Sequence, residues 1–149
     1  MHRMLAPLLA GAALLVAVPG AHAASNRSFD FKTPVFVNDG TAHTSGLASF
    51  KSAKRVVLTG RINDLCPQDG YGAYLDVTAH LEGTYSSIRY TAKDAGGCGD
   101  KDGVAYSFDI QSGRKITSLL LRLYECDQGG VCGGYGNEKV VTLDNAYVG

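Results

Sequence analysis

Apolar and polar residues alternate with a period of two along most of this chain, as is typical of half-buried β-strands. The alternating segments are rich in β-branched and aromatic residues and are bounded by Gly, Asp, Asn or Ser. Seven segments fit this description, at residues 29–37, 54–63, 72–82, 85–92, 104–111, 115–125 and 138–147. The pattern predicts an all-β protein, a single antiparallel β-sandwich of about seven strands, with a small closed β-barrel as the alternative.

Two turns predict how neighbouring strands pair. Gly83 and Thr84 fit a two-residue type II′ turn, which pairs Glu82 with Tyr85. In that register the apolar residues of both strands share one face and the polar residues share the other. A shift of one residue would mix the two sets, so their separation supports the register. A second turn at 112–113 predicts in the same way that the segment 104–111 pairs with 115–125.

The first 23 residues follow a different pattern. Arg3 precedes an unbroken apolar stretch over residues 5–18, and Ala21-His22-Ala23 resembles a signal-peptidase cleavage site. We therefore expect a secretory signal peptide at residues 1–23 and one domain at residues 24–149. The apolar stretch is too short for a transmembrane helix, so the prediction is a secreted, extracellular protein without membrane insertion.

Four cysteines lie in the predicted domain. An even number of cysteines in an oxidising compartment predicts two disulfides. Cys126 and Cys132 are close in sequence, which favours the pairs Cys126–Cys132 and Cys66–Cys98 and leaves the other pairings open. The spacing lacks the two close pairs that are typical of a zinc site.

The long connections of the predicted sandwich gather at one end if successive strands alternate in direction. Segments 65–71, 93–103 and 126–137 would all lie there, and long loops on a rigid scaffold often carry binding sites. The candidate binding residues in or beside these loops are Tyr71, Tyr135, Asp69 and Asp127. The plainer interpretation is that the loops only connect strands. Tyr74 and Tyr85, on the polar face of the first hairpin, are interpreted as ordinary strand residues.

One acidic segment has the composition of a calcium-binding turn. Asp100 and Asp102 alternate ahead of Gly103, and Asp94 precedes them. Alternating carboxylates on a flexible loop suit hard cations, although the full EF-hand spacing is missing. Asp94, Asp100 and Asp102 are therefore the candidate metal ligands. Calcium is the only cofactor that this sequence suggests. The alternative is that the Asp-Gly pair only forms a turn before the next strand, as is common in β proteins.

The charge of the chain and the motifs that it contains limit the classes of function that it could have. The chain has 14 Lys and Arg against 14 Asp and Glu, which argues against an electrostatically driven nucleic-acid binder. Two histidines remain after the signal peptide, His43 in what we expect to be a solvated loop and His80 on a strand, and no nucleophile motif is present. The prediction is a secreted, non-catalytic module that binds an extracellular protein or glycan. A protease inhibitor is the alternative, and a small secreted hydrolase is third.

Overall fold

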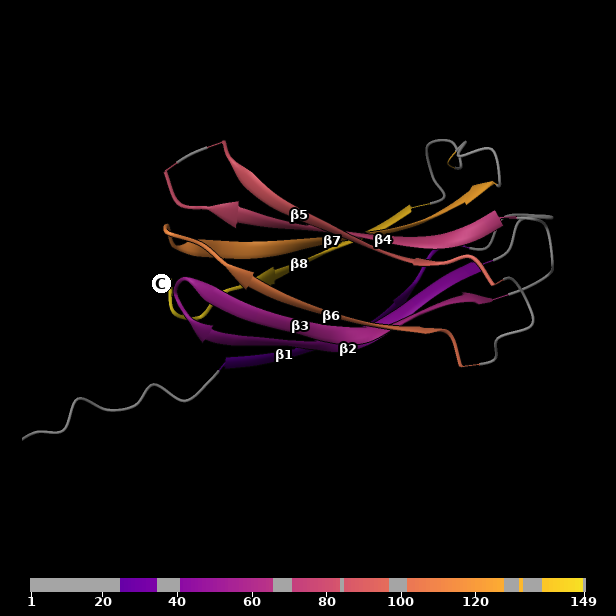
Figure 1. The fold of residues 1–149 in the computed structure, drawn as a ribbon, viewed down its shortest axis with the longest axis horizontal. Coiled ribbons are helices and arrows are strands. Elements are labelled where there is room, and N and C mark those ends of the chain that lie inside the picture. Colours follow the sequence, from indigo (N-terminus) through magenta and orange to yellow (C-terminus); the bar gives the residue numbers. More distant parts are fainter. Residues whose placement is uncertain are drawn as a thin grey trace, which may run out of the picture.

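The chain folds into two four-stranded antiparallel sheets that pack face to face (Figure 1). The computed structural model describes residues 25–34, 41–65, 71–83, 85–96, 102–127, 132 and 138–148. The strands are β1 (Ser25–Lys32), β2 (Thr41–Ser52), β3 (Arg55–Leu65), β4 (Tyr71–Leu81), β5 (Ser87–Asp94), β6 (Val104–Gln111), β7 (Ile116–Asp127) and β8 (Glu138–Asp144). The order of the strands is β1-β2-β3-β6 in one sheet and β5-β4-β7-β8 in the other. The predicted sandwich is therefore confirmed, and the alternative prediction of a closed barrel is wrong. The described residues contain no helix that is long and apolar enough to span a membrane.

Eight strands are present where the sequence predicts about seven, because β2 does not show the alternation of apolar and polar residues. The expected loop around His43 is wrong, since His43 lies within β2. Most inward positions of β2 are small or polar, and Phe50 alone is large (Ala42, Thr44, Gly46, Ala48 and Phe50). The alternation of large apolar and polar residues that identifies a half-buried strand is therefore weak here.

The first strand begins and ends earlier than predicted. β1 covers Ser25–Lys32, whereas the sequence pattern predicts residues 29–37. β1 is an edge strand that pairs only with β2, and its first four residues are polar and at least partly exposed. Such residues carry no hydrophobic alternation, so the strand is visible in the sequence only from Phe29 onward.

The predicted hairpin between β4 and β5 is confirmed in its register. Leu75 pairs with Ala92 and Val77 with Tyr90, as the turn at Gly83 requires. Gly83 has a φ of +68°, the left-handed conformation that glycine adopts without strain. The paired residues end at His80 and Ser87, so the loop is longer than a two-residue turn.

The second predicted hairpin is wrong. β6 pairs with β3 in one sheet, while β7 lies between β4 and β8 in the other. The connection between β6 and β7 crosses from sheet to sheet, held by hydrogen bonds from Ser112 N to Lys54 O (3.0 Å) and from Ile116 N to Ala53 O (2.7 Å). Strands that pair and strands that face each other across a core bury the same alternate positions, so the pattern cannot distinguish these arrangements.

Two facing glycines make room for aromatic rings in the core of the sheet β1-β2-β3-β6. Gly46 pairs with Gly60, and the rings of Phe29 and Tyr106 pack over them. The hydroxyl of Thr44 donates to the carbonyl of Arg61 (2.9 Å), so the buried Tyr106 hydroxyl is the donor in its 3.0 Å bond to Thr44. The bond satisfies a phenol that would otherwise be buried without a partner.

Alkaline pH should destabilise the protein through Tyr106. Burial raises the pKa of Tyr106 from 10.0 to about 12. The phenol is neutral in both states below pH 10, and between pH 10 and 12 only the unfolded state releases the proton. The free energy of unfolding should therefore fall in this window, by about 2 kcal/mol from this group.

Urea unfolding of the wild type and of Tyr106→Phe at pH 8 to 12 tests this expectation. At pH 8 the free energy of unfolding of the variant should be about 1 kcal/mol lower than that of the wild type, because Thr44 loses the hydrogen bond from the phenol. Between pH 10 and 12 the free energy of unfolding should then fall less in the variant than in the wild type. Ionisable groups that both proteins share contribute equally to the two profiles. Parallel profiles would contradict the role of Tyr106.

Candidate functional site

The outer face of the sheet β5-β4-β7-β8 presents polar and aromatic side chains in rows. The first row is Lys93, Tyr74, Tyr124 and Glu138; the second is Thr91, Asp76, Arg122 and Val140; the third is Arg89, Thr78, Leu120 and Thr142. Cross-strand neighbours in such rows lie close enough for their side chains to interact. The prediction that β4 and β5 turn their polar residues to this face is confirmed.

Two tyrosines and two cations form a continuous stack on this face, which we call the aromatic ladder (Lys93, Tyr74, Tyr124 and Arg122). The rings of Tyr74 and Tyr124 are stacked, with centroids 5.7 Å apart and planes inclined by 10°. Lys93 Nζ lies 5.0 Å from the Tyr74 ring and Arg122 Cζ lies 5.0 Å from the Tyr124 ring. Arg122 also forms an ion pair with Glu138. Tyr74 is therefore part of an ordered contact between neighbouring strands, and its interpretation as an ordinary strand residue stays a prediction.

Asp76 is held by two neutral hydroxyl groups beside the aromatic ladder. Its carboxylate accepts hydrogen bonds from Thr91 Oγ1 (2.8 Å) and from the Tyr124 hydroxyl (3.0 Å). Burial, followed by the charge of Asp76, raises the pKa of Tyr124 to about 12, so the phenol keeps its proton and remains a donor at neutral pH. The orientation of Asp76 is thus fixed before any ligand arrives.

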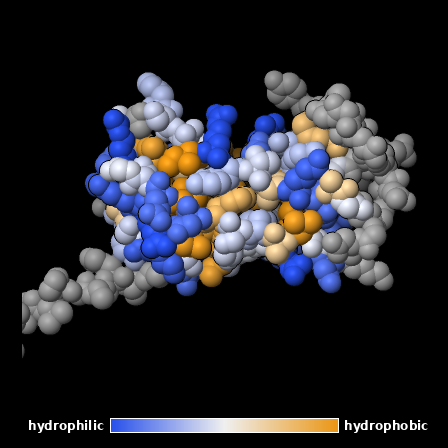
Figure 2. Space-filling model, in the orientation of Figure 1, coloured by the Kyte–Doolittle hydropathy of each residue, from blue (hydrophilic) through white to orange (hydrophobic). Residues whose placement is uncertain are grey.

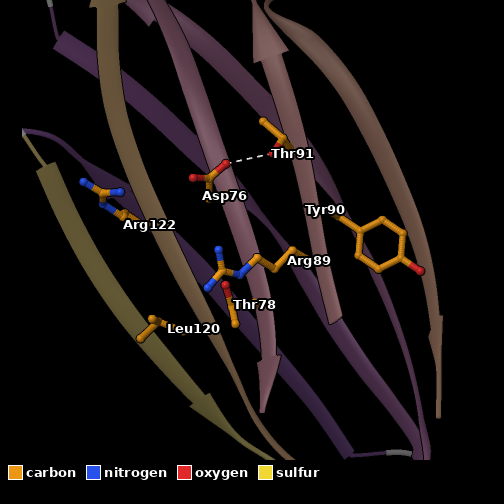
Figure 3. Close-up of a pocket in the computed structure, with 7 residues that line it drawn as sticks. All are labelled: Asp76, Thr78, Arg89, Tyr90, Thr91, Leu120 and Arg122. Carbon is orange, nitrogen blue, oxygen red and sulfur yellow. Dashed lines mark hydrogen bonds between the residues drawn. The ribbon is translucent and has the colours of Figure 1, made fainter. Parts of the chain in front are cut away.

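A shallow depression of about 390 Å³ lies next to Asp76 (Figure 3). Its lining residues are Asp76, Thr78, Arg89, Tyr90, Thr91, Leu120 and Arg122. Figure 3 shows the guanidinium of Arg89 close to the Thr78 side chain, with Arg122 on the other side of β4. Within the part of the chain that the structure describes, neither Arg89 nor Thr78 makes a side-chain hydrogen bond or ion pair. The depression therefore offers a planar set of N–H donors and a hydroxyl, which suit a carboxylate or another oxyanion.

A second depression, of about 430 Å³, lies on the opposite outer face of the sandwich. It is lined by His43, Ser45, Arg61, Asn63 and Asp102. His43 Nε2 lies 2.8 Å from Asp30 Oδ1, and Arg61 Nη1 donates to the carbonyl of Asp102 (2.8 Å). Among the described residues Ser45 and His43 are not hydrogen-bonded to each other. The depression thus lacks the contact between nucleophile and base that nucleophilic catalysis uses.

Two of the four predicted binding residues belong to strands, since Tyr71 begins β4 and Asp127 ends β7, at one end of the sandwich (right in Figure 1). The backbones of Tyr71 and Asp127 are paired across β4 and β7. The side chains of these two residues, and the whole of Asp69 and Tyr135, lie outside the described part of the structure. Binding through these four residues stays a prediction.

Asp94, a candidate calcium ligand, connects the two sheets at the same end. It is 1% exposed, and its carboxylate accepts hydrogen bonds from the backbone N–H groups of Asp64 (3.2 Å) and Gly96 (3.0 Å). Asp102 is exposed, and Asp100 lies outside the described residues. The residues that the structure describes contain no group of three metal-ligating side chains. Calcium binding by Asp94, Asp100 and Asp102 stays a prediction.

One of the two predicted disulfides is confirmed. Cys126 at the end of β7 is bonded to Cys132. Cys66 and Cys98 lie outside the described residues, so their pairing stays a prediction. The same holds for the inhibitor alternative, because residues 128–131 inside the Cys126–Cys132 loop are not described.

The aromatic ladder and the depression beside it were missed by the sequence analysis. Tyr74 and Tyr124 are fifty positions apart in sequence and meet only because β4 pairs with β7. The available signal was the polar face of β4 and β5, which already contains Arg89, Thr78 and Tyr74. A scan against protein-family models, a search of curated proteins and a search of solved structures each found no match to this chain.

Proposed function

We propose that this chain is an exported, non-catalytic protein that binds a partner protein through the outer face of the sheet β5-β4-β7-β8. The observation that carries the proposal is the pair Arg89 and Thr78, whose donors are unused within the described residues and lie beside the rigid aromatic ladder. The signal-peptide pattern of residues 1–23 and the Cys126–Cys132 disulfide support export, because disulfides persist in oxidising compartments.

The composition and rigidity of this face suit a protein interface. Tyrosine and arginine are the residue types that most often dominate binding energy at protein interfaces. Here the side chains of Tyr74, Tyr124 and Arg122 are already fixed by ring contacts, by the hydrogen bond of Tyr124 to Asp76 and by the ion pair of Arg122 with Glu138. Side chains that are ordered before binding lose less conformational entropy when the partner docks.

The same geometry disfavours a glycan at this face. A sugar ring packs on an open aromatic face, but both faces of Tyr74 are covered. Lys93 covers the ring from the β5 side, and Tyr124 covers it from the β7 side. A protein partner needs no open ring face, so it fits this surface better than a carbohydrate does.

The depression selects an acidic side chain of the partner. Asp76 is held by the hydroxyls of Thr91 and Tyr124 and forms no ion pair with Arg89. The guanidinium of Arg89 can therefore hold a carboxylate by two parallel hydrogen bonds, with Thr78 as a further donor. An aspartate or glutamate of the partner is the group that we expect there.

Replacing Arg89 should abolish capture of the partner. We expect the immobilised mature protein to retain at least one protein from spent culture medium, and Arg89→Ala to weaken that retention at least tenfold, as for a charged hot-spot residue. Arg89→Lys keeps the charge without the planar fork, so it should retain part of the binding. The measurement is quantitative mass spectrometry of the eluted proteins.

Arg27→Ala is the matched control, because Arg27 is an exposed arginine on β1 of the other sheet. A captured protein whose retention falls equally in both variants would not use the proposed face. If no captured protein depends on Arg89, or if a glycan array shows Arg89-dependent binding of a sugar, the proposal of a protein partner is wrong.

A further inference from the structure

Three connections meet at the end of the sandwich opposite the start of β4 and the end of β7 (left in Figure 1). They are the β2–β3 turn at residues 53–54, the β4–β5 loop and the β6–β7 connection at residues 112–115. Backbone hydrogen bonds join them, from Ser112 N to Lys54 O (3.0 Å) and from Glu82 N to Lys115 O (2.9 Å). The side chains of these connections therefore form one surface.

This surface is rich in cations, and we call it the basic end. Five exposed cationic side chains define it: Lys51, Lys54, Arg55, Arg114 and Lys115. Figure 2 shows strongly hydrophilic side chains gathered at this end of the molecule. The chain as a whole has a formal net charge of zero, so these five cations are not part of a general excess of positive charge.

Only two of the five cations are paired with a carboxylate in the described structure. Arg55 donates two hydrogen bonds to Asp109 (3.0 and 2.9 Å), and Lys115 Nζ lies 3.2 Å from Glu82. The nearby Asp144, at the end of β8, forms no ion pair with any of them.

The three cations left without a carboxylate are Lys51, Lys54 and Arg114. Arg114 reaches the β4–β5 loop through a 3.4 Å hydrogen bond to the carbonyl of Gly83. Lys51 is the extra residue of a β-bulge between Phe50 and Ser52, and such bulges re-aim a side chain at a strand end. Three exposed positive charges at this end are thus without a carboxylate partner among the described residues.

A fully exposed tyrosine stands beside these cations. Tyr85 follows Gly83 in the β4–β5 loop, and its ring is not covered by any side chain of the described residues. This separates Tyr85 from Tyr74, which is stacked on both faces. A free aromatic face next to uncompensated cations is the combination that an acidic sugar chain requires.

We propose that the basic end binds an anionic polysaccharide, with Lys51, Lys54 and Arg114 contacting its acidic groups and Tyr85 packing on a sugar ring. An anionic membrane fits less well, because Tyr85 is the only large exposed apolar residue among the described parts of this end. A nucleic acid fits less well, because its binders carry an excess of positive charge over the whole domain. The basic end shares no residue with the aromatic ladder, so this proposal does not depend on the proposed function.

Charge reversal at the basic end tests the proposal. The probes are polygalacturonate and heparin, and the measurement is the dissociation constant for the mature protein at increasing NaCl concentrations. For about three charges neutralised, the logarithm of the association constant, the inverse of the measured constant, should fall against log [NaCl] with a slope of about −3. Lys54→Glu with Arg114→Glu should make that slope less negative by about 2 and weaken binding at least tenfold. Tyr85→Ala should weaken binding about fivefold without changing the slope, since it removes packing and no charge.

The control is the double variant Lys32→Glu with Lys139→Glu, which makes the same change in net charge at exposed positions of β1 and β8 that lie toward the opposite end of the sandwich. It should bind within about twofold of the wild type at moderate salt, because screening limits the reach of distant charges. Equal weakening by both double variants would overturn the site. Binding to phosphatidylglycerol vesicles or duplex DNA, with none to either polysaccharide, would overturn the ligand class.

Discussion

A single added methyl group at position 46 should destabilise the protein by about 3 kcal/mol, because the core cannot move aside for it. A Cβ at Gly46 would lie 2.2 Å from the carbonyl oxygen of Thr59 and 2.7 Å from the ring of Phe29. The first of these atoms belongs to the backbone of the neighbouring strand, so relief requires a shift of β2 against β3. We expect Gly46→Ala to lower the urea midpoint of unfolding markedly.

Gly113→Ala is the matched control for this substitution. No atom lies within 4 Å of a Cβ at Gly113, and its φ is not positive. This variant should be neutral or more stable by about 0.5 kcal/mol, since alanine restricts the unfolded chain. If Gly46→Ala is no less stable than Gly113→Ala, the close pairing of β2 with β3 at Gly46 is wrong.

Asn145→Ala should also reduce the free energy of unfolding by about 3 kcal/mol, because it leaves several buried backbone groups without partners. Asn145 is 4% exposed, and its amide nitrogen donates to the carbonyls of Ile116 (2.8 Å) and Ser52 (3.4 Å). Its side-chain oxygen accepts from the backbone N–H of Tyr147 (3.0 Å). One side chain thus joins β7, the opposite sheet and the C-terminal turn.

Asn145→Asp distinguishes hydrogen bonding from packing at this position. It keeps the shape of the side chain but replaces the N–H donors with a charge that faces two carbonyls, so it should be at least as destabilising as alanine. The neighbouring Asp144 is exposed, and Asp144→Ala should change the stability by no more than about 0.5 kcal/mol. Thermal and urea unfolding measure all three variants. An Asn145→Asp variant of wild-type stability would contradict the assigned hydrogen bonds.

The sequence predicts those strands in which one face is clearly apolar and the other is clearly polar. The register of β4 with β5 could be predicted because Leu75, Val77 and Ala79 alternate with polar residues and Gly83 marks the turn. β2 could not, because glycine, alanine and threonine at inward positions give no apolar signal. The crossing between β6 and β7 could not, because Tyr106 and Ile110 are buried whichever sheet contains their strand.

The candidate sites were predictable only in part, for a related reason. The polar face of β4 and β5 was evident, but Tyr124 joins it through pairing between strands that are not neighbours in sequence. The cations at Lys54 and Arg114 are visible in the sequence in two separate turns. The alternation of successive strands already predicts that the two turns share one end, but the hydrogen bond from Ser112 N to Lys54 O that joins them is not evident from the sequence, and a formal net charge of zero gives no indication of the cluster of cations.

The order of the strands also determines when the protein can fold. Val56 of β3 pairs with Ile110 of the edge strand β6, and Leu75 pairs with Leu123 in the centre of the second sheet, so the partners are 54 and 48 positions apart. Pairing over such distances requires the closure of long loops, which places folding among the slower sandwiches, in milliseconds to seconds. β7 lies between β4 and β8, so the second sheet has no centre until residues 116–127 have been made. A chain that is synthesised from its N-terminus therefore cannot complete this sheet until its last quarter has been made, and a core that closes so late would suit the export that we propose.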